Sequence, residues 1–118
     1  MPERNHLIFL QDMIESIAKI QKYTEGMDYE AFSRSDLVTD AVVRNFEIIG
    51  EASNHMPEEV RSKYPDIPWS KMKGMRNLVI HEYFGVDYSI IWKTIESALP
   101  SLKEKIEKVV EIEGNPAR

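Results

Sequence analysis

The spacing of apolar residues is the feature that most constrains how this 118-residue chain can fold. Apolar side chains recur every three or four positions in four long stretches, from about residues 5 to 24, 36 to 55, 68 to 84 and 88 to 112. This period places them on one face of an α-helix, whereas a half-buried strand would alternate at every second residue. The sequence shows neither that alternation nor an internal repeat. The pattern therefore predicts an all-α protein, an antiparallel four-helix bundle with short connections.

Residues that start and end helices lie at the ends of these stretches. Gly26 follows the first stretch and Gly85 follows the third, and glycine commonly ends helices. Ser35 or Asp36 can cap the second helix, and Asp87 can cap the fourth. We expect the buried stripes to consist of Leu7, Leu10, Ile14, Ile17 and Ile20, of Val38, Val42, Phe46, Ile49, Ala52 and Met56, of Trp69, Met72, Met75, Val79 and Ile80, and of Ile91, Trp92, Ile95, Leu99, Leu102, Ile106 and Val109.

Pro100 lies inside the fourth stretch, where it removes one backbone hydrogen bond and predicts a bend within a single helix. An additional short helix is expected from about residue 57 to 64, and the segment 24–34 should be a turn with some helix. We expect one domain over residues 1–113 and a loose tail over residues 114–118.

Composition limits the classes of protein to which the chain can belong. Hydrophobic residues make up 42% and charged residues 30%, which is ordinary for a soluble globular protein. The chain has no cysteine, which excludes disulfides and thiolate metal sites. Its apolar runs are far shorter than the roughly 20 residues of a membrane span. The net charge of −5 argues against broad, non-specific nucleic-acid binding. We therefore expect a cytoplasmic protein without a membrane segment.

The residues best suited to chemistry lie near the end of the third stretch. Arg76 supplies a permanent planar cation that suits phosphate oxygens. His81 can take and give protons near neutral pH, and Tyr83 brings a hydroxyl that can donate, accept or be modified. Together they could hold a phosphodiester and move protons around it. By contrast, we interpret His6, at the frayed start of the first helix, as incidental.

Helical geometry separates two of these groups. At about 100° per residue, Arg76 and Tyr83 share a face, whereas His81 lies roughly 140° from Arg76 and shares a face with Asn77. A long arginine side chain, a loosened helix before Gly85 or a second copy of the chain could bring them together. We favour the second copy, because a two-fold axis would combine both faces in one cleft. The spacing thus predicts a homodimer.

Local charge near the motif is positive. Lys71, Lys73 and Arg76 are the charged residues between positions 69 and 80, and no acid accompanies them. They form either a small cationic patch or a lysine-rich solvated face, and the sequence favours neither.

The second stretch carries a row of charged residues with helical spacing. Arg44, Glu47 and Glu51 share a face distinct from the buried stripe. Two carboxylates four residues apart can bind a divalent cation. The adjacent arginine and the lack of a further acid at ligand spacing instead favour an Arg–Glu pair on a solvated or interface face. We predict no metal site.

Several segments together resemble a known family. The Arg-x4-His-x-Tyr pattern within residues 76–83, the segment 43–52 with its Glu-Ile-Ile-Gly-Glu-Ala sequence, and the segments 67–69 and 87–92 are similar to the HEPN superfamily, specifically to HepT-like toxins. The similarity spans residues 37 to 92. Arg-x4-His alone is weakly specific, and the tyrosine and the upstream block make the match stronger.

The resemblance implies a HEPN-like helical bundle and a metal-independent endoribonuclease without a cofactor. In that scheme His81 is general base or acid, Arg76 stabilises charge on the phosphoryl oxygens, and Asn77 orients His81 or the phosphate. Tyr83 would be the residue to which a nucleotidyltransferase antitoxin attaches AMP, which would block the cationic site and repel RNA. Secondary candidates for the cleft are Arg44, Glu47, Glu51 and Lys73.

Two other functions stay open at this point. The chain could be a non-enzymatic helical partner and substrate of a nucleotidyltransferase, which would need Tyr83 and tolerate loss of His81. It could also be a nucleotide-binding helical module that uses Arg76 and Lys73 for phosphate. Dependence of RNA cleavage on His81 separates the ribonuclease from both.

Overall fold

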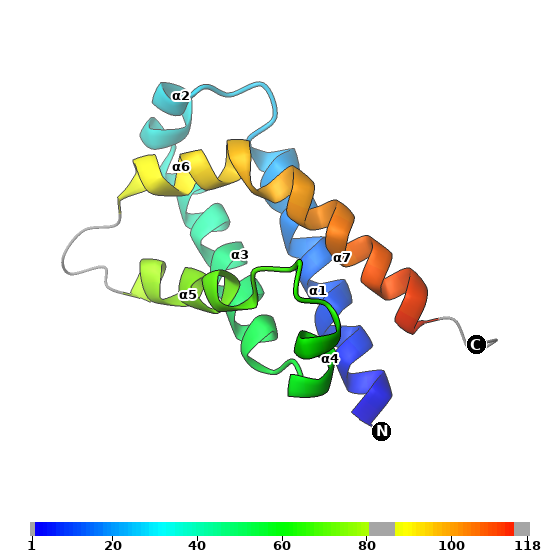
Figure 1. The fold of residues 1–118 in the computed structure, drawn as a ribbon. Coiled ribbons are helices and arrows are strands. Elements are labelled where there is room, and N and C mark those ends of the chain that lie inside the picture. The colour runs from blue at the N-terminus through cyan, green and yellow to red at the C-terminus, as the bar shows by residue number, and fades with distance from the viewer. Residues whose placement is uncertain (1, 81–86, 115–118) are drawn as a thin grey trace.

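All regular secondary structure in the described part of the chain is helical (Figure 1). The structure is a computed structural model that describes residues 2–80 and 87–114, with side chains described for residues 6–76 and 87–114. Over these residues the helices are α1 (Pro2–Tyr23), α2 (Tyr29–Arg34), α3 (Asp36–Asn54), α4 (Glu58–Lys63), α5 (Trp69–Ile80), α6 (Tyr88–Ser97) and α7 (Leu99–Glu113). The predicted all-α fold is confirmed.

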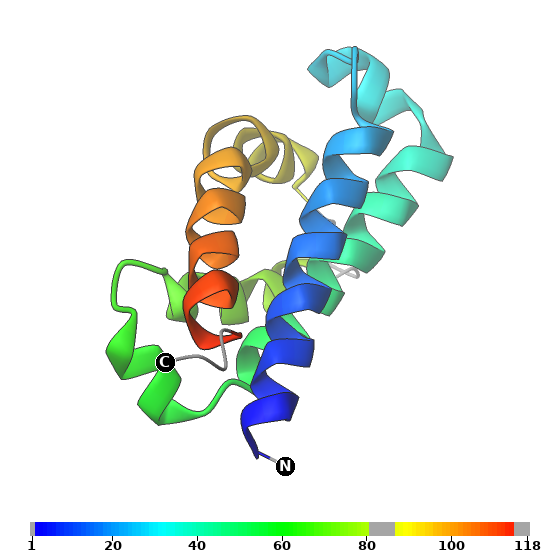
Figure 2. The same ribbon diagram turned by 90° about the vertical axis from the view of Figure 1, so that its right-hand side faces the viewer.

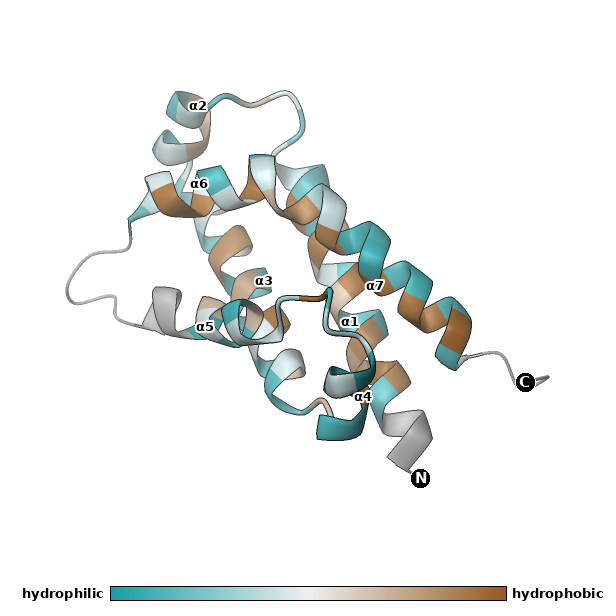
Figure 3. Ribbon diagram, in the orientation of Figure 1, coloured by the Kyte–Doolittle hydropathy of each residue, from teal (hydrophilic) through white to brown (hydrophobic). Residues whose placement is uncertain are grey.

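The long helices pack around one apolar core. Helices α1 and α3 run side by side in opposite directions, α7 packs along α1, and α5 crosses α3 (Figures 1 and 2). Each long helix carries both hydrophobic and hydrophilic segments, as a helix with one buried face should (Figure 3). The largest fully buried side chains are Phe32, Leu10, Met13, Ile17, Ile20, Ile49, Met72, Ile91, Leu99, Ile106 and Val42.

The predicted stripes are largely confirmed within the described residues. All seven predicted residues of the fourth stretch are buried, while Leu7, Ile14 and Val38 are partly buried against the core. The side chains of Val79 and Ile80 lie outside the described residues. None of the described helices combines the length and the apolar content needed to cross a membrane.

The predicted helix ends are confirmed where they are described. Gly26, shortly after α1, has φ of +77°, a left-handed conformation that glycine adopts without steric cost. The Ser35 side chain accepts a hydrogen bond from the Val38 amide at 3.2 Å and caps α3. Asp87 caps α6 by accepting from the Ser89 amide at 3.0 Å. The predicted stop at Gly85 lies outside the described residues.

The prediction of one bent fourth helix is wrong. The chain forms two helices, α6 and α7, which separate at Ala98 rather than at Pro100. Pro100 occupies the first turn of α7, where a residue without an N–H loses no intrahelical hydrogen bond. The proline therefore starts a helix instead of bending one.

The short helices join the ends of the long ones. Helix α4 confirms the additional helix predicted near residues 57–64, and α2 supplies the helical part of the segment before Ser35. Phe32 of α2 lies against Trp92 of α6, with ring centroids 5.1 Å apart. This aromatic contact ties α2 to α6.

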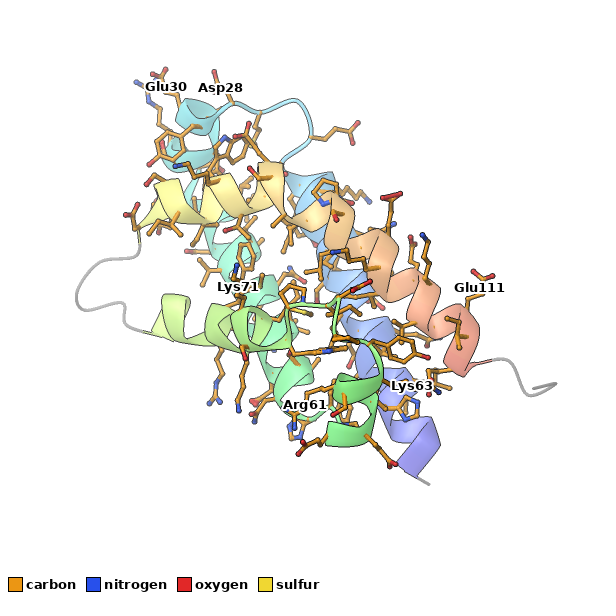
Figure 4. All side chains as sticks on the ribbon, viewed as in Figure 1. Asp28, Glu30, Arg61, Lys63, Lys71 and Glu111 are labelled. Carbon is orange, nitrogen blue, oxygen red and sulfur yellow. The ribbon has the colours of Figure 1, made fainter. Side chains whose placement is uncertain are left out.

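The interpretation of His6 as incidental is also wrong. His6 is buried, and its Nε2 lies 3.2 Å from Oε1 of Glu113. The other oxygen of Glu113 accepts hydrogen bonds from Lys63 Nζ at 2.8 Å and from the Tyr64 hydroxyl at 2.5 Å. We call His6, Lys63, Tyr64 and Glu113 the Glu113 cluster; it joins α1, the end of α4 and the end of α7 (Figure 4, Lys63 labelled).

Hydrogen bonding shifts the acidity of this cluster. The hydrogen bond from Lys63, followed by that from Tyr64, holds the pKa of Glu113 below its usual value. Burial, aided by the bond to Glu113, raises the pKa of Tyr64. Both shifts favour a charged carboxylate beside a neutral phenol. The contacts themselves tie together chain segments that are far apart in sequence.

Candidate functional site in the groove between α1, α3 and α5

A glycine sets the distance between α3 and α5. A Cβ atom built on Gly50 would lie 2.7 Å from the Cβ of Arg76 and 2.8 Å from its backbone nitrogen. These atoms belong to the backbone or sit directly on it, so they cannot swing aside as the tip of a side chain could. Only glycine at position 50 allows α5 to come this close, and the contact places Arg76 beside the charged row of α3.

That row and Arg76 line one groove. Its cavity volume is about 440 Å³, within the roughly 300–1,000 Å³ of typical ligand sites. The lining residues come from α1, α3 with its C-cap, and α5, and they define what we call the Arg76 groove: Phe9, Asp12, Arg44, Glu47, Ile48, Glu51, Ala52, His55 and Arg76. The sequence candidates Arg44, Glu47, Glu51 and Arg76 are thus brought together.

The ion pair of the groove differs from the one predicted. Nη1 of Arg76 lies 3.6 Å from Oε2 of Glu51, so the cation comes from α5 and not from Arg44 on the same helix. The side chains of Arg76 and Glu51 are 46% and 45% exposed. Pairs this exposed contribute only about 0–1 kcal/mol to stability. The contact therefore orients the guanidinium without making it unavailable to a ligand.

The second carboxylate oxygen of Glu51 faces a histidine that was not among the candidates from the sequence. Oε1 of Glu51 lies 4.0 Å from Nε2 of His55, and the His55 ring stacks on Phe9 with centroids 5.1 Å apart and planes inclined by 16°. The signal was present, because His55 follows Glu51 by four residues and so shares its helical face. Phe9 and Asp12 carried no such signal, since they reach the groove from α1.

The three cations predicted near the motif do not form one patch. Arg76 lines the Arg76 groove, whereas Lys71 lines a separate, mostly apolar cavity of about 520 Å³ between α5, α6 and α7 (Figure 4, Lys71 labelled). Lys73 is exposed and lines neither. At about 100° per residue, Lys71 points roughly 140° away from Arg76, whereas Lys73 is only about 60° from Arg76 and yet does not line the groove. Arg44, rather than Lys73, is the second cation of the groove.

The remaining motif residues stand only partly within the described chain. Helix α5 includes the backbone of Asn77, whose side chain is outside the described residues. His81 and Tyr83 also lie outside them. Their predicted roles, and the predicted offset between Arg76 and His81, stay predictions.

Charge in the groove is mixed. Arg44 and Arg76 stand beside Asp12, Glu47 and Glu51, so an incoming phosphate must compete with Glu51 for the Arg76 guanidinium. Within residues 6–76 and 87–114, no group of three His, Asp or Glu side chains is arranged to hold a metal ion. The described part of the groove can thus hold an anion through arginine.

Comparison with known proteins identifies the family. The family model described as "Ribonuclease HepT-like" matches residues 13–109. The chain is 43% identical over 115 residues to "Putative RNase MJ1216" of Methanocaldococcus jannaschii, covering 97% of this chain and 95% of that protein. It is 42% identical over 107 residues to "Probable ribonuclease HepT" of Thermococcus cleftensis, covering 91% of this chain and 97% of that protein. No solved structure matches the chain significantly. These matches confirm the resemblance drawn from the motifs, and the chain belongs to the HepT-like ribonuclease family.

Proposed function

We propose that this protein is a metal-independent endoribonuclease that binds RNA in the Arg76 groove. The observation that carries the proposal is the position of the Arg76 side chain in the groove. The chain also belongs to the HepT-like ribonuclease family. Gly50 allows the backbone of Arg76 to pack directly against α3. Glu51 orients the half-exposed guanidinium of Arg76 within a groove large enough for a ligand. A permanent cation held in this way suits the non-bridging oxygens of a phosphodiester.

The chemistry then needs a proton acceptor beside Arg76, and His81 fills that role in the proposal. His81 removes the proton of a ribose 2′-hydroxyl, the 2′-oxygen attacks the adjacent phosphorus, and the bond to the 5′-oxygen breaks. The leaving oxygen takes up a proton, and the products are a 2′,3′-cyclic phosphate and a 5′-hydroxyl end. Arg76 stabilises the negative charge that develops on the phosphoryl oxygens, and Asn77 orients His81 or the phosphate.

The proposal includes a homodimer, because a regular helix would place His81 roughly 140° around its axis from Arg76. Arg76 of one copy and His81 of the other would complete one cleft about a two-fold axis. Two half-sites of this kind would bind RNA together, which a single groove of mixed charge would do weakly.

Regulation in the proposal acts on Tyr83, seven residues after Arg76 in the sequence. A nucleotidyltransferase antitoxin would transfer AMP from ATP to the Tyr83 hydroxyl, releasing pyrophosphate. The added phosphate would occupy Arg76 and repel an RNA backbone, which makes the ribonuclease the toxin of a toxin–antitoxin pair. The variant Tyr83→Phe should keep cleavage and gain no AMP in mass spectrometry, whereas loss of cleavage in a folded Tyr83→Phe protein would place the hydroxyl in the cleavage chemistry.

The test is cleavage of a generic RNA in EDTA by the wild type, Arg76→Ala, His81→Ala and a 1:1 mixture of the two variants. We expect wild-type products with 2′,3′-cyclic phosphate ends, and a loss of about 100- to 1,000-fold in each variant alone. The mixture should recover activity, because mixed dimers contain one intact cleft.

Other outcomes overturn parts of the proposal. If EDTA abolishes cleavage by the wild type, the metal-independent mechanism is wrong. If the wild type is a monomer with full activity, the proposed cleft shared between two copies is wrong. No cleavage by the wild type, with AMP transfer to Tyr83 intact, would make the chain a non-enzymatic partner of the nucleotidyltransferase.

A further inference from the structure

The stacked pair of Phe9 and His55 has no role in the cleavage chemistry described above. Both residues line the Arg76 groove, Phe9 from α1 and His55 from the C-cap of α3. Phe9 packs partly buried against the hydrophobic core, whereas the His55 side chain is 54% exposed. The pair is therefore anchored at one ring and open to solvent at the other.

The contacts of His55 do not account for its position. Its Nε2 lies 4.0 Å from Glu51, which is beyond hydrogen-bonding distance, and an exposed pair of this kind adds little stability. Stacking on Phe9 does fix the plane of the imidazole ring. The result is a flat, partly exposed aromatic surface at the edge of a groove that also holds arginine.

Glu51 stands between a cation and an aromatic ring in the groove, which suits the two parts of a nucleotide. From Arg44 the face continues through Glu47 and Glu51 to His55, over about 16 Å at 1.5 Å per residue. Arg76 joins this row beside Glu51. A phosphate held by Arg76 therefore lies beside Glu51 and close to His55, and the uncharged base attached to it is not repelled by the carboxylates. Those carboxylates can also accept hydrogen bonds from the N–H groups of a base.

We propose that Phe9 and His55 form a stacking subsite for an unpaired nucleobase of single-stranded RNA whose phosphate is held by Arg76. The proposal rests on the proposed ribonuclease function and names its substrate as unpaired RNA. Proteins commonly bind splayed bases of single-stranded RNA by stacking them on aromatic side chains, histidine included. A base in a duplex is stacked between its neighbours and cannot reach such a surface.

The test measures binding of a 2′-O-methyl RNA oligonucleotide, which lacks the attacking hydroxyl, to the otherwise intact protein. His55→Ala should raise the Kd about tenfold, since one base stacked on an aromatic ring typically accounts for a 5- to 150-fold change. His55→Phe keeps an aromatic ring and should bind within about threefold of wild type. Tyr29→Ala serves as the control, because Tyr29 is an exposed aromatic residue on α2, outside the groove.

An abasic oligomer of the same length separates stacking from charge. It carries the same phosphates without bases, so His55→Ala should not change its Kd. An equal loss of binding to both oligomers would show that His55 acts through charge, and this would overturn the subsite. Phe9→Leu keeps an apolar side chain under His55 while removing the ring, and it should weaken binding of the base-containing oligomer only.

The two proposals fail in different ways. Wild-type cleavage of RNA with unchanged Kd and KM in His55→Ala overturns the stacking subsite and leaves the ribonuclease standing. No wild-type cleavage overturns the ribonuclease, and base-dependent binding lost in His55→Ala would still support the subsite. Failure of the wild type to bind the oligonucleotide overturns the subsite as well.

Discussion

Two glutamates in this protein contact similar types of residue but differ in burial and in the lengths of their contacts. Glu51, in the Arg76 groove, faces an arginine at 3.6 Å and a histidine at 4.0 Å, and its side chain is 45% exposed. Glu113, in the Glu113 cluster, faces a lysine at 2.8 Å, a tyrosine at 2.5 Å and a histidine at 3.2 Å, with only 12% exposure. The contacts of Glu113 are short and its own carboxylate is largely buried, so they hold chain segments together. The contacts of Glu51 are long and its carboxylate is half-exposed, so they leave Arg76 and His55 free for a ligand. Residue types alone therefore do not separate a structural cluster from a candidate site.

The largest effect is expected where the groove depends on its glycine. Gly50→Ala places a methyl group against the backbone of Arg76 and should destabilise the fold by about 1–3 kcal/mol. A displacement of Arg76 by about 1 Å should also lower cleavage about 100-fold. Urea unfolding and RNA cleavage measure the two effects.

Gly74 offers a matched control for that substitution, because it lies in α5 and an added Cβ would meet nothing within 4 Å. Gly74→Ala should keep cleavage and gain up to about 1 kcal/mol from helix propensity. Equal effects at both glycines would refute the role of the close approach at Gly50.

An intermediate effect is expected from the matched substitutions of the two glutamates. Glu113→Gln removes the charge that partners a buried histidine and a tyrosine hydroxyl, and should lower the free energy of unfolding by about 1–2 kcal/mol. Glu51→Gln should change it by less than about 0.5 kcal/mol and lower cleavage instead. Denaturation and cleavage of both variants give the comparison, and the reverse pattern would exchange the structural and functional assignments.

The smallest effect is expected in the pH dependence of stability. The pKa of Glu113 in the folded chain lies below its ordinary value of about 4.5, chiefly because Lys63 and then Tyr64 donate hydrogen bonds to it. The unfolded chain therefore binds the proton first as pH falls. The contribution of Glu113 is present above pH 4.5 and is lost as pH falls through that value towards the folded pKa. Thermal midpoints between pH 7 and 3 should show a shallower decline in Glu113→Gln than in wild type.

Parallel curves for Glu113→Gln and wild type would show that other carboxyl groups carry the acid sensitivity. Glu51→Gln is again the control, since the half-exposed Glu51 side chain makes only long contacts that should add little stability.

Much of the fold was predictable because helix formation follows local rules. The period of apolar residues predicted the long helices, and Ser35 and Asp87 cap helices as expected. Pro100 was misread because a proline in the first turn of a new helix and one inside a bent helix leave the same mark in a sequence. Whether the helix breaks at Ala98 depends on how α6 and α7 pack, which no local pattern encodes.

The candidate site was predictable only where its members share one helix. Arg44, Glu47 and Glu51 were placed on one face by their spacing, and in the structure they line one groove. The pairing of Glu51 with Arg76 was missed, because it joins α3 to α5. Phe9 was missed for the same reason, and His55 was overlooked although its spacing from Glu51 was visible.

The sequence by itself determined the helices, most of their caps, the buried stripes and the family-like motif around Arg76, since each is set by residues within a few turns of one another. Only the tertiary structure decided that Gly50 admits α5, that Arg76 meets Glu51, and that His6 reaches Glu113 across more than 100 positions. Those contacts join segments far apart in the chain, and their geometry follows from how close two packed helices can come.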